Sequence, residues 1–93
     1  MTERSSNVLV LLSDEHCADL MGVAGHPLAR TPHLDALAAR GTRFTNAYTP
    51  SPICVSARAS LATGLPVHQH RCWDNAIAYE GRDKSWGHRL QEA

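Results

Sequence analysis

Cys54 and Arg58 are the first residues whose types and spacing predict chemistry. They stand at the two ends of the segment CVSAR, which is followed by ASLATG. At the start of a helix, free backbone N–H groups and the positive end of the helix dipole favour a thiolate or a bound oxyanion. A side chain four residues later lies on the same helix face. A nucleophile and a cation can therefore converge on one anion here; the alternative is a small buried cysteine beside a surface arginine.

Asp14 and Glu15 form a second candidate site. They follow Ser13, which ends an apolar run over residues 8–12. In open α/β sheets, ligands gather at the carboxyl ends of the strands. Carboxylate oxygens suit a hard divalent cation. We therefore predict a metal site at this position, with two solvated turn residues, or an Asp14 that caps a short helix, as the alternatives.

His68, His70 and Cys72 alternate along the chain and would face the same way in an extended segment, as zinc ligands can. A structural zinc ion needs a fourth ligand, and no second Cys or His pair stands at a familiar spacing. We therefore favour loop histidines near the mouth of a substrate site over a zinc site.

These side chains must be positioned by an α/β arrangement. The run over residues 8–12 is apolar on both faces, which is typical of a central parallel strand covered by helices. A shorter strand is predicted over residues 42–48. Helices are predicted over residues 31–41, with Thr at the N-cap, Pro at the first position and Gly at the end, and over residues 56–63 and 85–92. The stretch after Pro66 is predicted to be a loop.

Composition limits the partners of the chain. Its 93 residues make one small domain at most. The formal net charge of zero leaves no broad basic field for nucleic acid or an anionic membrane surface. Eight of the nine basic residues are arginines, whose guanidinium groups can donate two parallel hydrogen bonds to an oxyanion.

The three cysteines are too few and odd in number for a disulfide scaffold. The apolar run over residues 8–12 is too short for a signal sequence or a membrane span. We therefore expect a cytoplasmic protein that does not bind membranes.

The segments CVSAR and ASLATG resemble the signature of the type I sulfatases, which belong to the alkaline phosphatase superfamily. Residues 7–14, 30–37 and 44–48 are similar to that family's opening strand with its metal-binding acid, its first long helix and the segment that leads into the signature. The resemblance covers nearly the whole chain. It implies that residues 1–93 are an N-terminal segment of a sulfatase-like catalytic domain, an alkaline-phosphatase-like sandwich with a central, mainly parallel sheet, incomplete as given.

The resemblance also implies site roles. Cys54 matches the position oxidised to formylglycine, whose hydrated form attacks sulfur and then releases sulfate. Asp14, Glu15 and the Cys54 position match the ligands of a divalent cation, Ca²⁺ first, with Mn²⁺ or Mg²⁺ as alternatives. Arg58 matches the arginine that orients the hydrated aldehyde, and Asn75 an asparagine that donates to a substrate oxygen; a loop-capping role is the alternative for Asn75.

Two positions depart from the family pattern. Ser56 stands where the family usually has a proline that the maturation enzyme reads. Glu15 stands where many sulfatases carry Asp, and where relatives that hydrolyse phosphonate or phosphate esters have an amide. The family's second pair of metal ligands, its lysine and its catalytic histidines are not found in the chain.

The sequence thus predicts a hydrolase of small-molecule sulfate esters that is served by a formylglycine-generating maturation enzyme, with the 93-residue chain inactive by itself. A phosphonate or phosphate ester hydrolase of the same superfamily is the first alternative. A non-catalytic truncated product and a small metal-binding module are the others.

Overall fold

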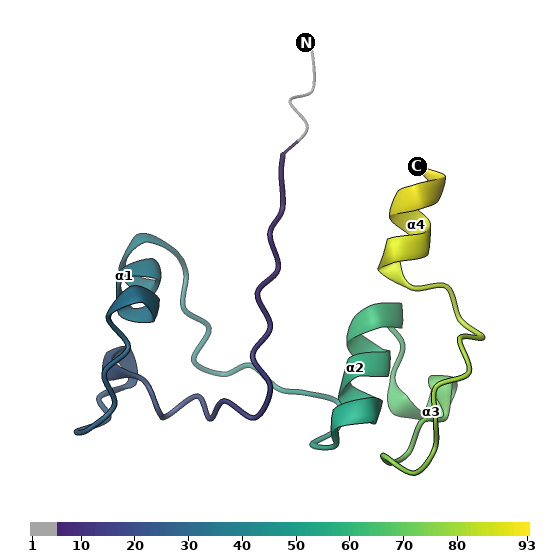
Figure 1. Cartoon of the computed structure of the whole chain (residues 1–93), viewed down its shortest axis with the longest axis horizontal. Helices are drawn as coiled ribbons and strands as arrows, with labels where there is room; N and C mark the ends of the chain where they lie inside the picture. Colours follow the sequence, from purple (N-terminus) through teal and green to yellow (C-terminus); the bar gives the residue numbers. More distant parts are fainter. Residues whose placement is uncertain (1–5) are drawn as a thin grey trace. The chain divides into compact units, whose positions relative to one another are not determined.

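The computed structural model describes residues 6–93, which divide into two compact units at Phe44 and Thr45 (Figure 1). The first unit contains a short 3-10 helix and one α-helix: η1 (Gly22–Ala24) and α1 (Pro32–Arg40). The second contains three α-helices: α2 (Cys54–Thr63), α3 (Val67–His70) and α4 (Trp86–Glu92).

Residues 6–93 contain no β-strand. The apolar run from Val8 to Leu12 is extended in Figure 1, but its side chains are 64–83% exposed. A strand is defined by hydrogen bonds to a neighbouring strand, and no described segment pairs with this run or with residues 42–48. The prediction of a buried strand over residues 8–12 is therefore wrong for this structure, and so is the strand over 42–48. The described chain is helical, and the sheet of the α/β sandwich stays a prediction.

The helix predicted over residues 31–41 is confirmed by α1, which begins at Pro32 and is followed by Gly41. The side chain of Thr31 does not cap its own helix. Its hydroxyl accepts the N–H of Gly22 at 2.9 Å and donates to Asp35 Oδ1 at 2.9 Å. Asp35 Oδ1 also accepts the N–H of Val23 at 2.8 Å. These bonds attach η1 to the first turn of α1.

Gly22 is held against the carboxylate of this cluster. A Cβ added at Gly22 would collide with Oδ2 of Asp35. We expect Gly22→Ala to destabilise the first unit by about 1–3 kcal/mol, because Asp35 must leave its bonds to Val23 and Thr31 to make room. Urea unfolding followed by circular dichroism measures the change. Gly41→Ala is the matched control, since its Cβ would meet Leu37 O at 3.4 Å; an equal loss in both variants would contradict this role of Gly22.

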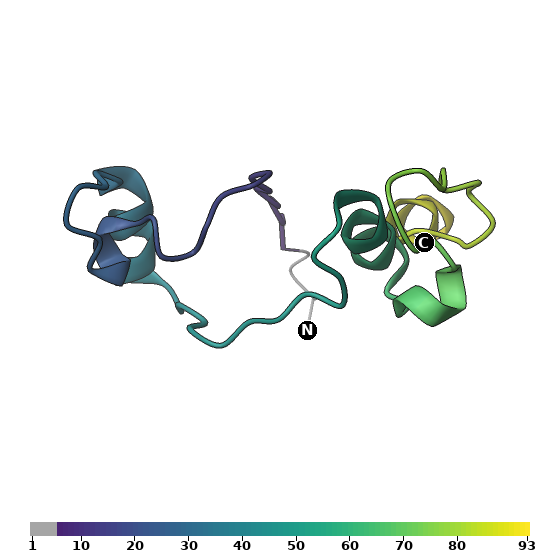
Figure 2. The ribbon, with the colours of Figure 1, turned by 90° about the horizontal axis from the view of Figure 1, so that it is seen from below.

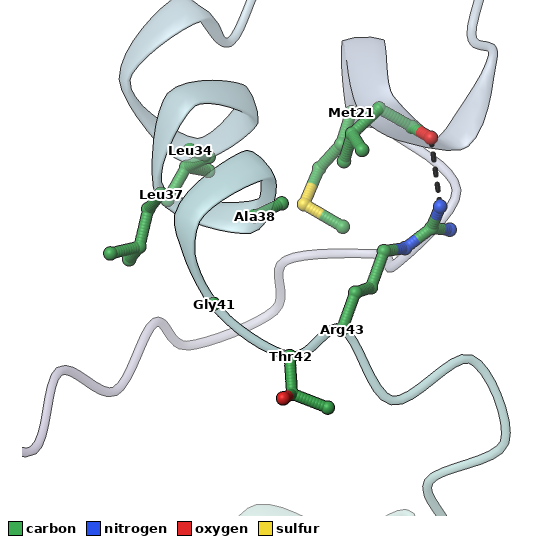
Figure 3. A pocket seen from close by; sticks show the side chains of 8 residues that line it. Met21, Leu34, Leu37, Ala38, Gly41, Thr42 and Arg43 are labelled. Carbon is green, nitrogen blue, oxygen red and sulfur yellow. Dashed lines mark hydrogen bonds between the residues drawn. The ribbon is translucent and has the colours of Figure 1, made fainter.

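An open hollow of about 390 Å³ lies beside α1 in the first unit (Figure 3). Its lining is mainly apolar and includes Met21, Leu34, Leu37 and Ala38. Arg43 borders it and donates from Nη1 to the carbonyl of Val23 at 2.8 Å, which ties the segment after α1 back to η1. No carboxylate, cysteine or histidine lines this hollow.

In the second unit, α2 packs against α3 and α4, and Figures 1 and 2 both show these helices beside it. The helix predicted over residues 56–63 is present but begins earlier, at Cys54. The last predicted helix is confirmed by α4, where the N–H of Ser85 donates to His88 Nδ1 at 3.2 Å. The prediction of a loop after Pro66 is wrong for Val67–His70, which form α3.

The interior of the second unit is mostly polar. Within the described part of the chain, Ala59 and Cys72 are the only buried apolar side chains. The buried polar side chains all belong to the second unit: Ser51, Ser56, Ser60 and His70. Hydrogen bonds among such groups must therefore carry much of the cohesion of this unit. None of the helices in residues 6–93 combines the length and apolar character that a membrane crossing requires.

Candidate functional site

Cys54 is the first residue of α2 and is half-buried. The loop before it is held by its own side chains: the Thr49 hydroxyl donates to the carbonyl of Ser51 at 2.7 Å, and Ser51 Oγ accepts the N–H of Ile53 at 3.2 Å. Ile53 is extended at the N-cap and contributes no side-chain cap. Cys54 therefore sits where the first backbone N–H groups and the helix dipole favour negative charge, as predicted.

Arg58 lies one turn further along α2, and its side chain is exposed. The four-residue spacing puts it on the helix face that also carries Cys54. Its guanidinium can bind two oxygens of a tetrahedral oxyanion side by side. The structure thus brings the predicted nucleophile and the predicted cation onto one helix face.

Asn75 lies beside the start of α2, although it is far from Cys54 along the chain. Its Oδ1 accepts the N–H of Val55 at 3.0 Å. The bond satisfies one of the first N–H groups of the helix, so Asn75 caps the start of α2 in this structure. It uses only the oxygen of the amide, and an amide NH₂ carries two donors. The substrate-donor role is therefore compatible with this geometry and stays a prediction.

The turn that presents Asn75 is built by Asp74, whose Oδ1 accepts the N–H groups of Ala76 at 2.7 Å and Ile77 at 3.2 Å. A side-chain oxygen that accepts backbone N–H groups two and three residues later is the usual Asx turn. Asp74 is thus a supporting residue that the sequence analysis missed, and its signal is an Asp directly before the candidate residue Asn75.

His70 is not the substrate-mouth histidine that we predicted, because it is only 1% exposed. Its Nδ1 accepts the N–H of Cys72 at 3.1 Å, and its Nε2 lies 2.8 Å from Ser60 Oγ. Since Nδ1 accepts, the neutral ring carries its proton on Nε2 and donates it to Ser60. Both nitrogens are engaged within the protein. Residues 6–93 contain no group of three or more His, Cys, Asp or Glu side chains arranged to hold a metal.

Asp14 and Glu15 belong to the first unit and are both exposed. Glu15 has φ 54°, a left-handed conformation that is uncommon for a residue with a side chain. The chain therefore bends directly after the extended run, and two neighbouring acidic residues lie at the bend. Their convergence with Cys54 stays a prediction.

Comparison of the sequence with known proteins identifies a family and several relatives. The sequence profile of the sulfatase family matches residues 6–90. Choline-sulfatase from Rhizobium meliloti is 36% identical over 93 residues, the whole of this chain and 18% of that protein. Arylsulfatase from Clostridium perfringens is 39% identical over 64 residues, which cover 69% of this chain and 13% of that protein.

Human arylsulfatase A is 45% identical over 65 residues, which cover 69% of this chain and 13% of that protein. The chain thus spans less than a fifth of the length of these relatives. No solved structure gives a significant match. The family match covers both the acidic pair and the segment that opens α2. The chain belongs to the sulfatase family.

Proposed function

We propose that this chain is the nucleophile-bearing segment of a hydrolase that acts on small-molecule sulfate esters. The observation that carries the proposal is the start of α2. Cys54 is the first residue of the helix, and the side chain of Asn75 accepts the N–H of Val55, the next residue. The family match and the names of the relatives, choline-sulfatase and arylsulfatase, support sulfate as the group that is transferred.

The residues around Cys54 have separate tasks in this proposal. The first turn of α2 stabilises negative charge through the helix dipole. Arg58 adds a permanent cation with forked donors, so that charge developing on the sulfate oxygens in the transition state is stabilised. Asn75 turns its amide donors to a substrate oxygen while its own oxygen is held by Val55. Cys54 is the precursor of a formylglycine, which supplies the oxygen nucleophile when it is present.

Asp14 and Glu15, with the Cys54 position, are the proposed ligands of a divalent cation. Carboxylate oxygens are the hard donors that Ca²⁺ prefers, and Mn²⁺ and Mg²⁺ are alternatives. A bound cation would polarise the oxygens of the sulfate group. Two carboxylates supply fewer oxygens than the six to eight that Ca²⁺ takes, so the set needs further ligands. We propose a cytoplasmic enzyme whose partner is a formylglycine-generating maturation enzyme.

The chemical state of Cys54 tests this proposal. When the chain is produced together with the maturation enzyme, we expect the peptide containing Cys54 to lose about 18 Da by mass spectrometry, the change from thiol to aldehyde. Ser56→Pro should raise the converted fraction, because proline presents the rigid backbone that the enzyme reads. The first turn of α2 tolerates proline, since its N–H groups have no partner within the helix.

The peptides that contain Cys17 and Cys72 are internal controls and should keep their thiols. A thiol that persists at Cys54 in both variants would overturn the formylglycine part of the proposal. If such an unconverted protein also cleaved phosphate esters in preference to sulfate esters, the phosphonate or phosphate ester hydrolase would become the better assignment. Glu15 does not decide between the two candidates, since it stands where many sulfatases carry Asp and where the phosphonate and phosphate ester hydrolases have an amide.

A further inference from the structure

Three side-chain hydrogen bonds join the segment of residues 70–75 to the first two turns of α2. Asn75 accepts from Val55, Ser56 Oγ donates to the carbonyl of Cys72, and His70 pairs with Ser60. The partners on α2 follow one another along a single helix, and the partners on the segment follow in the reverse order. The two strips of chain are therefore held in one register.

Ser56 is the most enclosed of these residues, with 0% of its surface exposed. Its hydroxyl donates to the carbonyl of Cys72, which is also a buried residue. A buried carbonyl without a donor costs more than the bond itself contributes, so this contact matters more than a surface hydrogen bond. A proline at the same position has no hydroxyl and cannot make it.

Cys72 is held on both sides of its backbone. Its carbonyl accepts from Ser56, and its N–H donates to His70 Nδ1 at 3.1 Å. Only Trp73 and Asp74 separate Cys72 from Asn75, and the Asp74 carboxylate tightens the turn that follows. With so short a connection, fixing Cys72 leaves Asn75 little freedom to leave the start of α2.

We propose that Ser56 is a positioning residue: by holding the Cys72 carbonyl, it sets Asn75 on the N–H of Val55, next to Cys54. Ser56 stands where the family usually has a proline, two residues after Cys54. The serine therefore has two effects: its hydroxyl anchors the segment that carries Asn75, and the rigid proline backbone is lost. The inference rests on the proposed function only for the roles of Cys54 and Asn75.

Amide hydrogen exchange in the 93-residue chain, followed residue by residue by NMR, tests the inference without any turnover. Asn75→Ala removes the acceptor and should speed exchange at the Val55 N–H by about tenfold, and Ser56→Ala should speed it by about three- to tenfold. The Gly64 N–H, which donates to Ser60 O at 2.8 Å at the other end of α2, reports general loosening of the helix and should change less than twofold.

Thr63→Ala is the matched control. It also removes a hydroxyl of α2 that donates to a carbonyl, that of Ala59 at 2.7 Å, but this bond does not reach the 70–75 segment. We expect it to leave exchange at Val55 unchanged. The inference is overturned if Ser56→Ala leaves Val55 unchanged, if it speeds Val55 and Gly64 equally, or if Asn75→Ala has no effect at Val55. The state of Cys54, read separately by mass, shows whether the proposed function fails instead.

Discussion

Sulfate-ester hydrolysis is expected to fall by about 10³-fold or more when Cys54 is replaced by alanine. The enzyme for this experiment is Rhizobium meliloti choline-sulfatase in which the matching 93 residues are replaced by this chain, since the alignment covers the chain completely. Alanine keeps the helix start intact but removes the side chain that is the proposed precursor of the nucleophile. Initial rates on choline sulfate and on a chromogenic aryl sulfate measure the loss.

Cys17→Ala is the control for this prediction, because it removes an exposed thiol from the first unit and should leave the rate within about twofold. We also expect the 93-residue chain alone to show no turnover, since the second pair of metal ligands, the lysine and the catalytic histidines of the family are not found in it. Retention of activity in the Cys54→Ala enzyme would refute Cys54 as the nucleophile. Turnover by the isolated chain that Cys54→Ala abolishes would refute only the dependence on further ligands.

The elements that the sequence predicts well are those whose signals are local. Pro32 and Gly41 mark the two ends of α1, and Ser85 marks the start of α4, because caps and terminators act within one helical turn. The four-residue α3 is too short for a periodic pattern. The sequence also gives no signal for the end of α3. The left-handed residue that follows the helix is Arg71, with φ 61°, and not the usual glycine.

The predicted strands depend on partners that a local pattern cannot supply. The apolar run over residues 8–12 satisfies every local condition for a buried strand, yet its side chains stay exposed, because pairing and burial are properties of neighbouring segments. The same limit applies to Asn75. Its contact with Val55 joins residues that are 20 apart in the chain, and the spacing alone gave no reason to place them together.

The candidate site shows where residue type misleads. Ser56 and Ser60 are polar and one turn apart, a pattern that normally indicates a solvent-facing stripe of a helix, but both are buried. The signal that could have identified them is the composition of that face, which also carries Ala59 and Thr63. A face made of small side chains lets another segment approach closely, and the serines then meet partners on that segment.

His70 is the residue whose loss is expected to cost the second unit the most stability. We expect His70→Ala to lower the free energy of unfolding by about 3 kcal/mol, because it leaves a cavity and removes partners from two buried groups, the hydroxyl of Ser60 and the N–H of Cys72. Urea unfolding followed by circular dichroism measures the change. His68→Ala is the matched control on the same short helix α3, exposed, with an expected change within about 0.5 kcal/mol.

A second measurement keeps this prediction testable if His70→Ala leaves too little folded protein for an unfolding curve. Cys72 is buried and Cys17 is exposed, so alkylation by iodoacetamide under native conditions should label Cys17 first in the unsubstituted chain. His70→Ala should raise the alkylation rate at Cys72 toward that at Cys17, because it removes the buried hydrogen bonds that hold the polar interior together. His68→Ala should leave the alkylation rate at Cys72 unchanged, because His68 is exposed. Equal protection of Cys72 in all three proteins would show that the buried hydrogen bonds of His70 do not hold the second unit together.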